Sequence, residues 1–160
     1  MVARGLKQDF YICGGAALIA LGVVSRSTND VDLLLPKINA EMKAAIAAMA
    51  EKLGLSDGWV NNGPDDMVEY LDQGWRERCT QIFSGQALKV FCLSRQELLN
   101  TKLWAACDRI DDVPDILAMS PSEDELAVAR QWVLRCDGAS LWAEIVDQCV
   151  AHIGKRLADG

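Results

Sequence analysis

The sequence contains one histidine, His152, and no Cys-x-x-Cys pair among its six cysteines. These two scarcities exclude HExxH sites and histidine-rich metal sites. A Ser-His-Asp or Cys-His mechanism would require His152 as its base, and no nucleophile motif lies near that residue. Any chemistry in this chain is therefore expected to depend on carboxylates and lysines.

Positive charge is also scarce, since the net charge is −7 and the acidic excess lies after residue 56. This disfavours non-specific binding to nucleic acid or to an anionic membrane. No apolar run approaches the length that spans a bilayer, and the first residues lack the apolar segment of a signal peptide. Most cysteines lie in apolar or periodic stretches, which is typical of buried thiols in a reducing cytoplasm. We expect a cytoplasmic protein with no membrane partner.

What the sequence does contain is an alternation of strand and helix signals. A strand is expected at 10–13, followed by a helix that starts at Gly14-Gly15 and ends near Gly22. A second strand is expected at 30–35, before Pro36. A helix capped by Asn39 is expected to end at Gly54 with Met42, Ile46, Met49 and Leu53 inward. Residues 79–83 and 87–93 predict a hairpin, while 59–60 and 68–71 could be short strands.

Helix signals dominate the remainder of the chain. Ser94-x-x-Glu97 predicts a capping box before a stripe of Leu99, Leu103, Ala106 and Ile110. Ser120-Pro121 predicts a helix start, with Leu126, Ala129, Val133 and Cys136 facing inward. A last helix is expected from Ser140, with an inward stripe of Leu141, Ile145, Cys149 and His152 or Ile153. The expected fold is α/β (α+β), a single domain over 1–160 with a core at 1–93 and packed C-terminal helices at 94–160.

Asp30 and Asp32 are two residues apart on a predicted strand, so both side chains should point to the same face. Neighbouring carboxylates repel one another, and a divalent cation is a good reason to place them together. Gly14 and Gly15 lie at a strand-to-helix turn, where backbone N–H groups can approach a phosphate. If the two strands are neighbours, phosphate and metal ligands share one pocket, as phosphoryl or nucleotidyl transfer requires.

Each motif also has a structural interpretation. A glycine pair after a strand is often only a turn, and two aspartates can mark a solvated strand end. The chain could then be an α/β domain without this chemistry.

A glycine pair, a short helix and then Arg-x-Thr-x-Asp-hydrophobic-Asp resembles the signature of the DNA polymerase β-like nucleotidyltransferase superfamily. The similarity is greatest to small uncharacterised bacterial nucleotidyltransferase-like proteins and to abortive-infection (toxin–antitoxin) nucleotidyltransferases. The matching residues are Gly14, Gly15, Arg26, Thr28, Asp30 and Asp32. The resemblance continues over GWRERCTQIF, LKVFCLSRQELLNTKLWAACDR and DVPDILAMSPSEDELAVARQWV, and so covers most of the chain.

The resemblance implies a nucleotidyltransferase-like mixed sheet and a role for each matching residue. Gly14 and Gly15 would hold the triphosphate of an NTP, Asp30 and Asp32 would bind Mg²⁺ or Mn²⁺, and Arg26 and Thr28 would line the pocket. Lys102 would face the phosphates, and Asp115, with Asp112 nearby, matches a further functional acid. From the residues alone, Lys102 could instead be a lysine at a helix edge whose ammonium reaches water, Arg26 a surface charge, and the acids helix caps.

Three departures from the superfamily pattern stand out. Ala16 follows the glycine pair where many relatives have serine, and the strand Leu88-Lys89-Val90-Phe91-Cys92 has no third metal-binding acid. Asp112 or Asp115 could substitute for it. The chain before Phe10 is short for the helix that relatives place there, and a missing helix would leave an apolar patch that a second copy could cover as a homodimer.

The sequence therefore predicts an Mg²⁺-dependent transfer of a nucleoside monophosphate to a hydroxyl. The acceptor could be RNA such as a tRNA end, a partner protein or a small molecule. The alternative is a catalytically degenerate nucleotide-binding module or a toxin–antitoxin interaction module, which the missing third acid and Ala16 favour.

Overall fold

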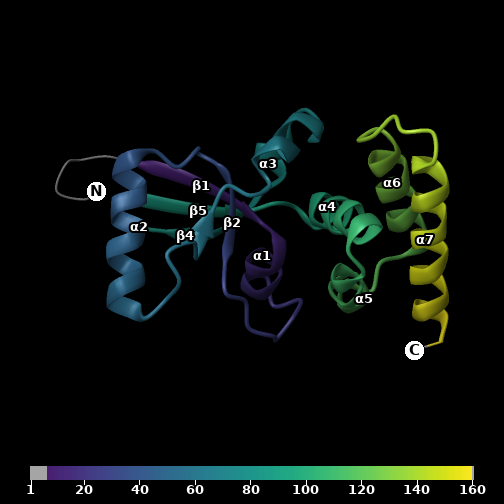
Figure 1. Ribbon diagram of the computed structural model, residues 1–160, viewed down its shortest axis with the longest axis horizontal. Helices are drawn as coiled ribbons and strands as arrows, with labels where there is room; N and C mark the ends of the chain where they lie inside the picture. Colours follow the sequence, from purple (N-terminus) through teal and green to yellow (C-terminus); the bar gives the residue numbers. More distant parts are fainter. Residues whose placement is uncertain (1–6, 160) are drawn as a thin grey trace. The chain divides into compact units, whose positions relative to one another are not determined.

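The computed structural model describes residues 7–159, and its contacts divide the chain into two compact units (Figure 1). We call Met1–Ser94 the sheet unit and Arg95–Gly160 the helical unit, and describe each by itself. The expectations about a leader and about a helix before the first strand fall mainly on residues 1–6, which lie outside the described range.

The sheet unit is built on a five-stranded mixed sheet in the order β3-β2-β1-β5-β4. Its strands are β1 (Gln8–Cys13), β2 (Val31–Leu35), β3 (Val60–Asn61), β4 (Thr80–Ser84) and β5 (Leu88–Cys92). β1 is central, antiparallel to β2 and parallel to β5, while β4 and β5 form the predicted hairpin. The prediction of a mixed sheet with flanking helices and a helical C-terminal part is confirmed.

Helix α1 (Gly14–Ala20) packs on one face of this sheet. Ile12 pairs with Leu33 on β2 and with Cys92 on β5, and all three side chains are buried. The Cys92 thiol lies 4.0 Å from the carbonyl oxygen of Ala17, which places α1 against this face. The short helix α3 (Trp75–Arg78) lies on the opposite side of β1 (Figure 1), where Trp75 meets Tyr11.

Helix α2 (Ala40–Leu53) has the predicted ends, because the Asn39 side chain accepts the N–H of Met42 at 2.9 Å and Gly54 is left-handed with φ 67°. The predicted inward stripe is only partly correct. Met42 is buried, but Met49 and Leu53 are 43% and 57% exposed. Burial instead follows Met42, Ile46 and Ala50, the i, i+4 ridge by which helices commonly pack. The segment expected as a strand at 68–71 belongs largely to a 3₁₀ helix, η2 (Asp65–Tyr70).

The helical unit comprises α4 (Arg95–Asp108), a 3₁₀ turn η3 (Ile110–Asp112), α5 (Val113–Met119), α6 (Glu123–Leu134) and α7 (Trp142–Ala158). Its core is formed by fully buried side chains from four helices, among them Leu99, Leu103, Ile116, Val133 and Ile153. No helix within residues 7–159 combines the length and apolar character needed to cross a membrane.

Three expectations for the helical unit are wrong in detail. Helix α4 ends before Ile110, which is 69% exposed, and the separate helix α5 follows with Pro114 in its first turn. The cap of α6 is Ser122, because Ser120 is left-handed and ends α5. In α7 the fully buried positions are Val146 and Ile153. Ile153 was one of the two alternatives at the end of the predicted stripe, and Cys149 in that stripe is partly buried. Leu141, Ile145 and His152 are exposed, because the buried face of the helix is rotated by about one residue from the predicted one.

All six cysteines are free thiols. Cys13, Cys92 and Cys136 are buried, while Cys79, Cys107 and Cys149 are partly buried. Burial raises the pKa of Cys92 and of Cys136 to about 11, so these two thiols stay protonated at neutral pH. They therefore serve as small apolar core groups.

Glu125 closes the capping box of α6 and joins it to α4. Its carboxylate accepts the N–H of Ser122 at 2.9 Å and pairs with Arg95 Nε at 2.7 Å. The Arg95 hydrogen bond and then the Ser122 N–H lower the pKa of Glu125 from 4.5 to about 2. The stabilisation is therefore present above pH 4.5 and is lost as the pH falls through about 2.

We predict that Glu125→Gln lowers the free energy of unfolding by about 1 kcal/mol at pH 7, because Arg95 is half-exposed and solvent screens the pair. Urea titrations should show the difference from wild type shrinking as the pH falls toward 2. A constant difference at every pH would contradict the ionic origin of this stabilisation.

Candidate functional site

The glycine pair follows β1 directly, beside the acidic strand β2. Cys13 pairs with Asp32 across the sheet, and Gly14 comes next with φ +67°. A Cβ atom on Gly14 would fall on Asp32 Oδ2. Only a residue without a side chain can therefore occupy position 14, and the Asp32 carboxylate lies against the backbone of the turn.

The Arg26 side chain lies beside the same turn, next to Gly15. A Cβ on Gly15 would lie 2.8 Å from Arg26 Nη2, so the guanidinium rests on the Gly15 backbone. The chain after α1 returns here, and Arg26 Nη1 also donates to the carbonyl oxygen of Ser27 at 3.3 Å. The structure thus brings together Gly14, Gly15, Arg26 and Asp32, four of the residues expected to form the site.

Thr28 and Asp30 form a second contact just before β2. The Thr28 hydroxyl donates to Asp30 Oδ1 at 3.0 Å and is 3.4 Å from the Asp30 carbonyl oxygen. Asp30 is exposed and Asp32 is partly buried. Thr28 therefore restrains the Asp30 carboxylate, and the glycine turn allows the Asp32 carboxylate to lie against the backbone of Gly14.

The donor set suits a hard divalent cation that completes its shell with water or phosphate oxygen atoms. Asp30 and Asp32 supply two carboxylates. Because Gly14 has no side chain, Asp32 Oδ2 can occupy the space in which a Cβ atom would otherwise lie. Within residues 7–159 no group of three or more His, Cys, Asp or Glu side chains is placed to hold a metal. On β5 the residues opposite Asp9 and Tyr11 are Lys89 and Phe91, so this strand offers no third acid on that face.

Lys102, Asp112 and Asp115 meet inside the helical unit. Lys102 is 7% exposed, and its Nζ lies 2.7 Å from both Asp112 Oδ1 and Asp115 Oδ2. Arg109 Nη2 approaches Asp112 Oδ2 at 3.2 Å, so two cations face two carboxylates. Burial opposes the charged ammonium, but the hydrogen bonds to Asp112 and Asp115 outweigh it and raise the pKa of Lys102. The catalytic role expected for these residues stays a prediction.

Sequence analysis missed a group of aromatic side chains in the sheet unit. The rings of Tyr11 and Phe91, paired on β1 and β5, stack with centroids 5.2 Å apart and an interplanar angle of 17°. Trp75 meets Tyr11 edge-on, also at 5.2 Å, and the Arg76 guanidinium lies 5.8 Å from the Tyr11 centroid. The pairing of β1 with β5 brings these residues together. The available signal in the sequence was an aromatic residue two positions before Cys13 and another directly before Cys92.

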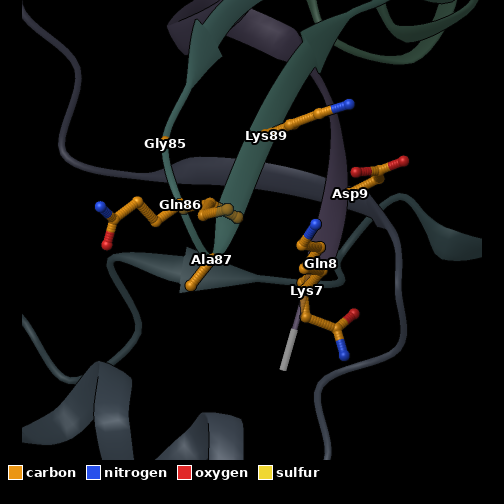
Figure 2. A pocket seen from close by; sticks show the side chains of 8 residues that line it. Lys7, Gln8, Asp9, Gly85, Gln86, Ala87 and Lys89 are labelled. Atoms are coloured by element: carbon orange, nitrogen blue, oxygen red, sulfur yellow. The ribbon is translucent and has the colours of Figure 1, made fainter. Parts of the chain in front are cut away.

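A cavity of about 660 Å³ opens at the other end of the same strands (Figure 2). It is lined by the starts of β1 and β5 and the hairpin turn, including Lys7, Asp9, Gln86 and Lys89. The glycine turn follows the end of β1, so this cavity is separate from the candidate site.

The fold and the site thus define an α/β protein whose mixed sheet has a central strand that ends in a glycine turn, against an aspartate of the neighbouring strand. A family model described as "Nucleotidyltransferase of unknown function (DUF6036)" matches residues 1–123, and the chain belongs to this family. No curated protein and no solved structure matches it. Membership of a nucleotidyltransferase family is thereby confirmed, while the polymerase β-like superfamily and the abortive-infection link stay predictions.

Proposed function

We propose that this protein transfers a nucleoside monophosphate from an NTP to a hydroxyl of RNA, protein or a small molecule, and releases pyrophosphate. The observation that supports this most is the Asp32 carboxylate lying against the Gly14 backbone, with Arg26 on Gly15. A carboxylate, a guanidinium and two glycine residues then lie at one turn, and binding of a metal–triphosphate uses groups of these kinds.

Each residue has a defined part in this proposal. Asp30 and Asp32 hold Mg²⁺ or Mn²⁺, which when bound neutralises phosphate charge and lowers the pKa of the attacking hydroxyl. The N–H groups of Gly14 and Gly15 bind phosphate oxygen atoms, and Arg26 adds positive charge. Thr28 keeps Asp30 in position through its 3.0 Å hydrogen bond. The acceptor hydroxyl gives its proton to solvent water, and its oxygen attacks the α-phosphorus. The bond from this phosphorus to the oxygen that bridges to the β-phosphate breaks, and pyrophosphate leaves.

Lys102, with Asp112 and Asp115 beside it, is proposed to take part in catalysis. This part of the proposal depends on the resemblance to the polymerase β-like superfamily. All three positions lie within residues 1–123, which the family model matches.

The proposal is tested by label transfer from each of four α-³²P-labelled NTPs, with Mg²⁺ or Mn²⁺, into cellular RNA and protein. We expect wild-type protein to label an acceptor and Asp32→Asn to reduce the label to background, since it removes a metal-binding charge but keeps the side-chain shape. Asp57→Asn, an exposed acid elsewhere in the sheet unit, is the matched control and should label normally.

A second candidate is a nucleotide-binding or toxin–antitoxin module without catalysis. The observation that favours it is the lack of a third acid on β5, where Lys89 stands opposite Asp9 and Phe91 stands opposite Tyr11. Binding of Mg²⁺·NTP with no label in any acceptor would select this candidate. Label that persists in Asp32→Asn, or no nucleotide binding at all, would contradict the proposed chemistry.

A further inference from the structure

We propose that the rings of Tyr11 and Phe91, together with Arg76, bind the base of the nucleotide, and that this surface favours purines. We call these three residues the base platform. The inference rests on the proposed function, because it takes the phosphates to lie at the Gly14–Asp32 turn.

The strand β1 places Tyr11 on the same face of the sheet as Asp32. The β1–β2 register shifts between Tyr11 and Ile12, where β2 has one residue more. Along β1 itself, side chains two apart share a face, so Tyr11 lies on the side of Cys13, which pairs directly with Asp32. Phe91 is the β5 partner of Tyr11, within a β1–β5 register that runs without a shift. Two residues of strand separate Tyr11 from the Cys13–Asp32 pair by about 7 Å. This is comparable to the span of the ribose between a base and its α-phosphate.

Tyr11 and Phe91 form a stacked pair that Trp75 supports. Their ring planes are nearly parallel at 17°, so one face of each ring lies against the other, whereas Trp75 meets Tyr11 edge-on at 76° and is buried. Tyr11 and Phe91 themselves are only partly buried, and Arg76 is exposed. The supporting ring is thus fixed in the fold, while the stacked pair retains accessible surface.

Arg76 places an exposed cation over the rings of Tyr11 and Trp75. Its guanidinium lies 5.8 Å from the Tyr11 centroid and 5.3 Å from that of Trp75, within the range of cation–π attraction. A base that inserts between Tyr11 and Arg76 would stack on the ring and be covered by the planar guanidinium on its other side. A purine has a larger π-face for this stacking than a single-ring pyrimidine, which is why a purine should bind more tightly.

The test compares nucleotides with tripolyphosphate, which carries the phosphates but no base. Calorimetric titration of Mg²⁺·ATP, Mg²⁺·GTP, Mg²⁺·CTP, Mg²⁺·UTP and Mg²⁺·tripolyphosphate would use wild type, Arg76→Gln and Phe91→Leu. We expect both variants to weaken purine nucleotides roughly ten- to hundredfold and to leave tripolyphosphate within about twofold of wild type. Lys43→Gln, which removes an exposed charge on α2, is the control and should change neither affinity.

The outcomes separate this inference from the proposed function. Asp32→Asn should weaken nucleotide and tripolyphosphate alike, and failure of wild type to bind either would overturn the proposed function and the base platform with it. Tripolyphosphate binding as tight as that of ATP, or variants that leave the two affinities in their wild-type ratio, would overturn the base platform alone. Arg76 is exposed, so Arg76→Gln remains a valid test if Phe91→Leu does not fold.

Discussion

Gly14→Ala is expected to abolish nucleotidyl transfer and to destabilise the sheet unit by more than about 2 kcal/mol. An L-residue in the left-handed region costs roughly 1–2 kcal/mol, and Gly14 has φ +67°. The added methyl group would also fall on Asp32 Oδ2, so either the turn or the carboxylate must move. Urea unfolding and label transfer measure the two effects separately.

Gly22→Ala is the matched control, because it isolates the cost of the backbone conformation. Gly22 has φ +72°, and a Cβ there would meet no atom within 4 Å. It should lose only the roughly 1–2 kcal/mol of backbone strain and keep its activity. Equal stability losses at positions 14 and 22 would contradict the close approach of Asp32. Asp32→Ala combined with Gly14→Ala should destabilise less than the sum of the two single changes, since it removes the clash.

Local signals predicted much of the sheet unit correctly. Asn39 and Gly54 mark the ends of α2 through chemistry that involves only nearby backbone, and Val31–Leu35 forms β2 as expected before Pro36. The glycine pair and the two aspartates were also recognised, because their residue types and order carry the signal. Strand pairing adds the contact itself, in which Asp32 Oδ2 occupies the space of a Gly14 side chain.

The features that sequence analysis missed depend on tertiary contacts. Tyr11 and Phe91 stack only because β1 pairs in parallel with β5, far away in the chain. In α7 two apolar stripes compete, and packing selects the one that contains Val146 and Ile153. The start of α6 was misplaced because Ser120 and Ser122 are both plausible caps, and the left-handed conformation of Ser120 decides between them.

Lys102→Met is expected to destabilise the protein by about 3–5 kcal/mol, because it leaves Asp112 and Asp115 buried without their shared cation. The pKa of Lys102 is raised above its usual 10.5, so its stabilisation is complete below pH 10.5 and is lost as the pH rises through the higher value. In Lys102→Met, the free energy of unfolding should therefore not show this decrease at alkaline pH. Lys155→Met removes an exposed lysine of the same unit and should change stability by at most about 0.5 kcal/mol.

A triple variant separates the structural role of this cluster from a role in catalysis. Asp112→Asn and Asp115→Asn, combined with Lys102→Met, remove the uncompensated charges and should restore much of the lost stability. If Lys102 contacts the triphosphate, the triple variant should be folded but inactive, with tripolyphosphate binding weakened. If it is folded and labels its acceptor at the wild-type rate, Lys102 serves only to join α4 to the start of α5, and the site consists of sheet-unit residues alone.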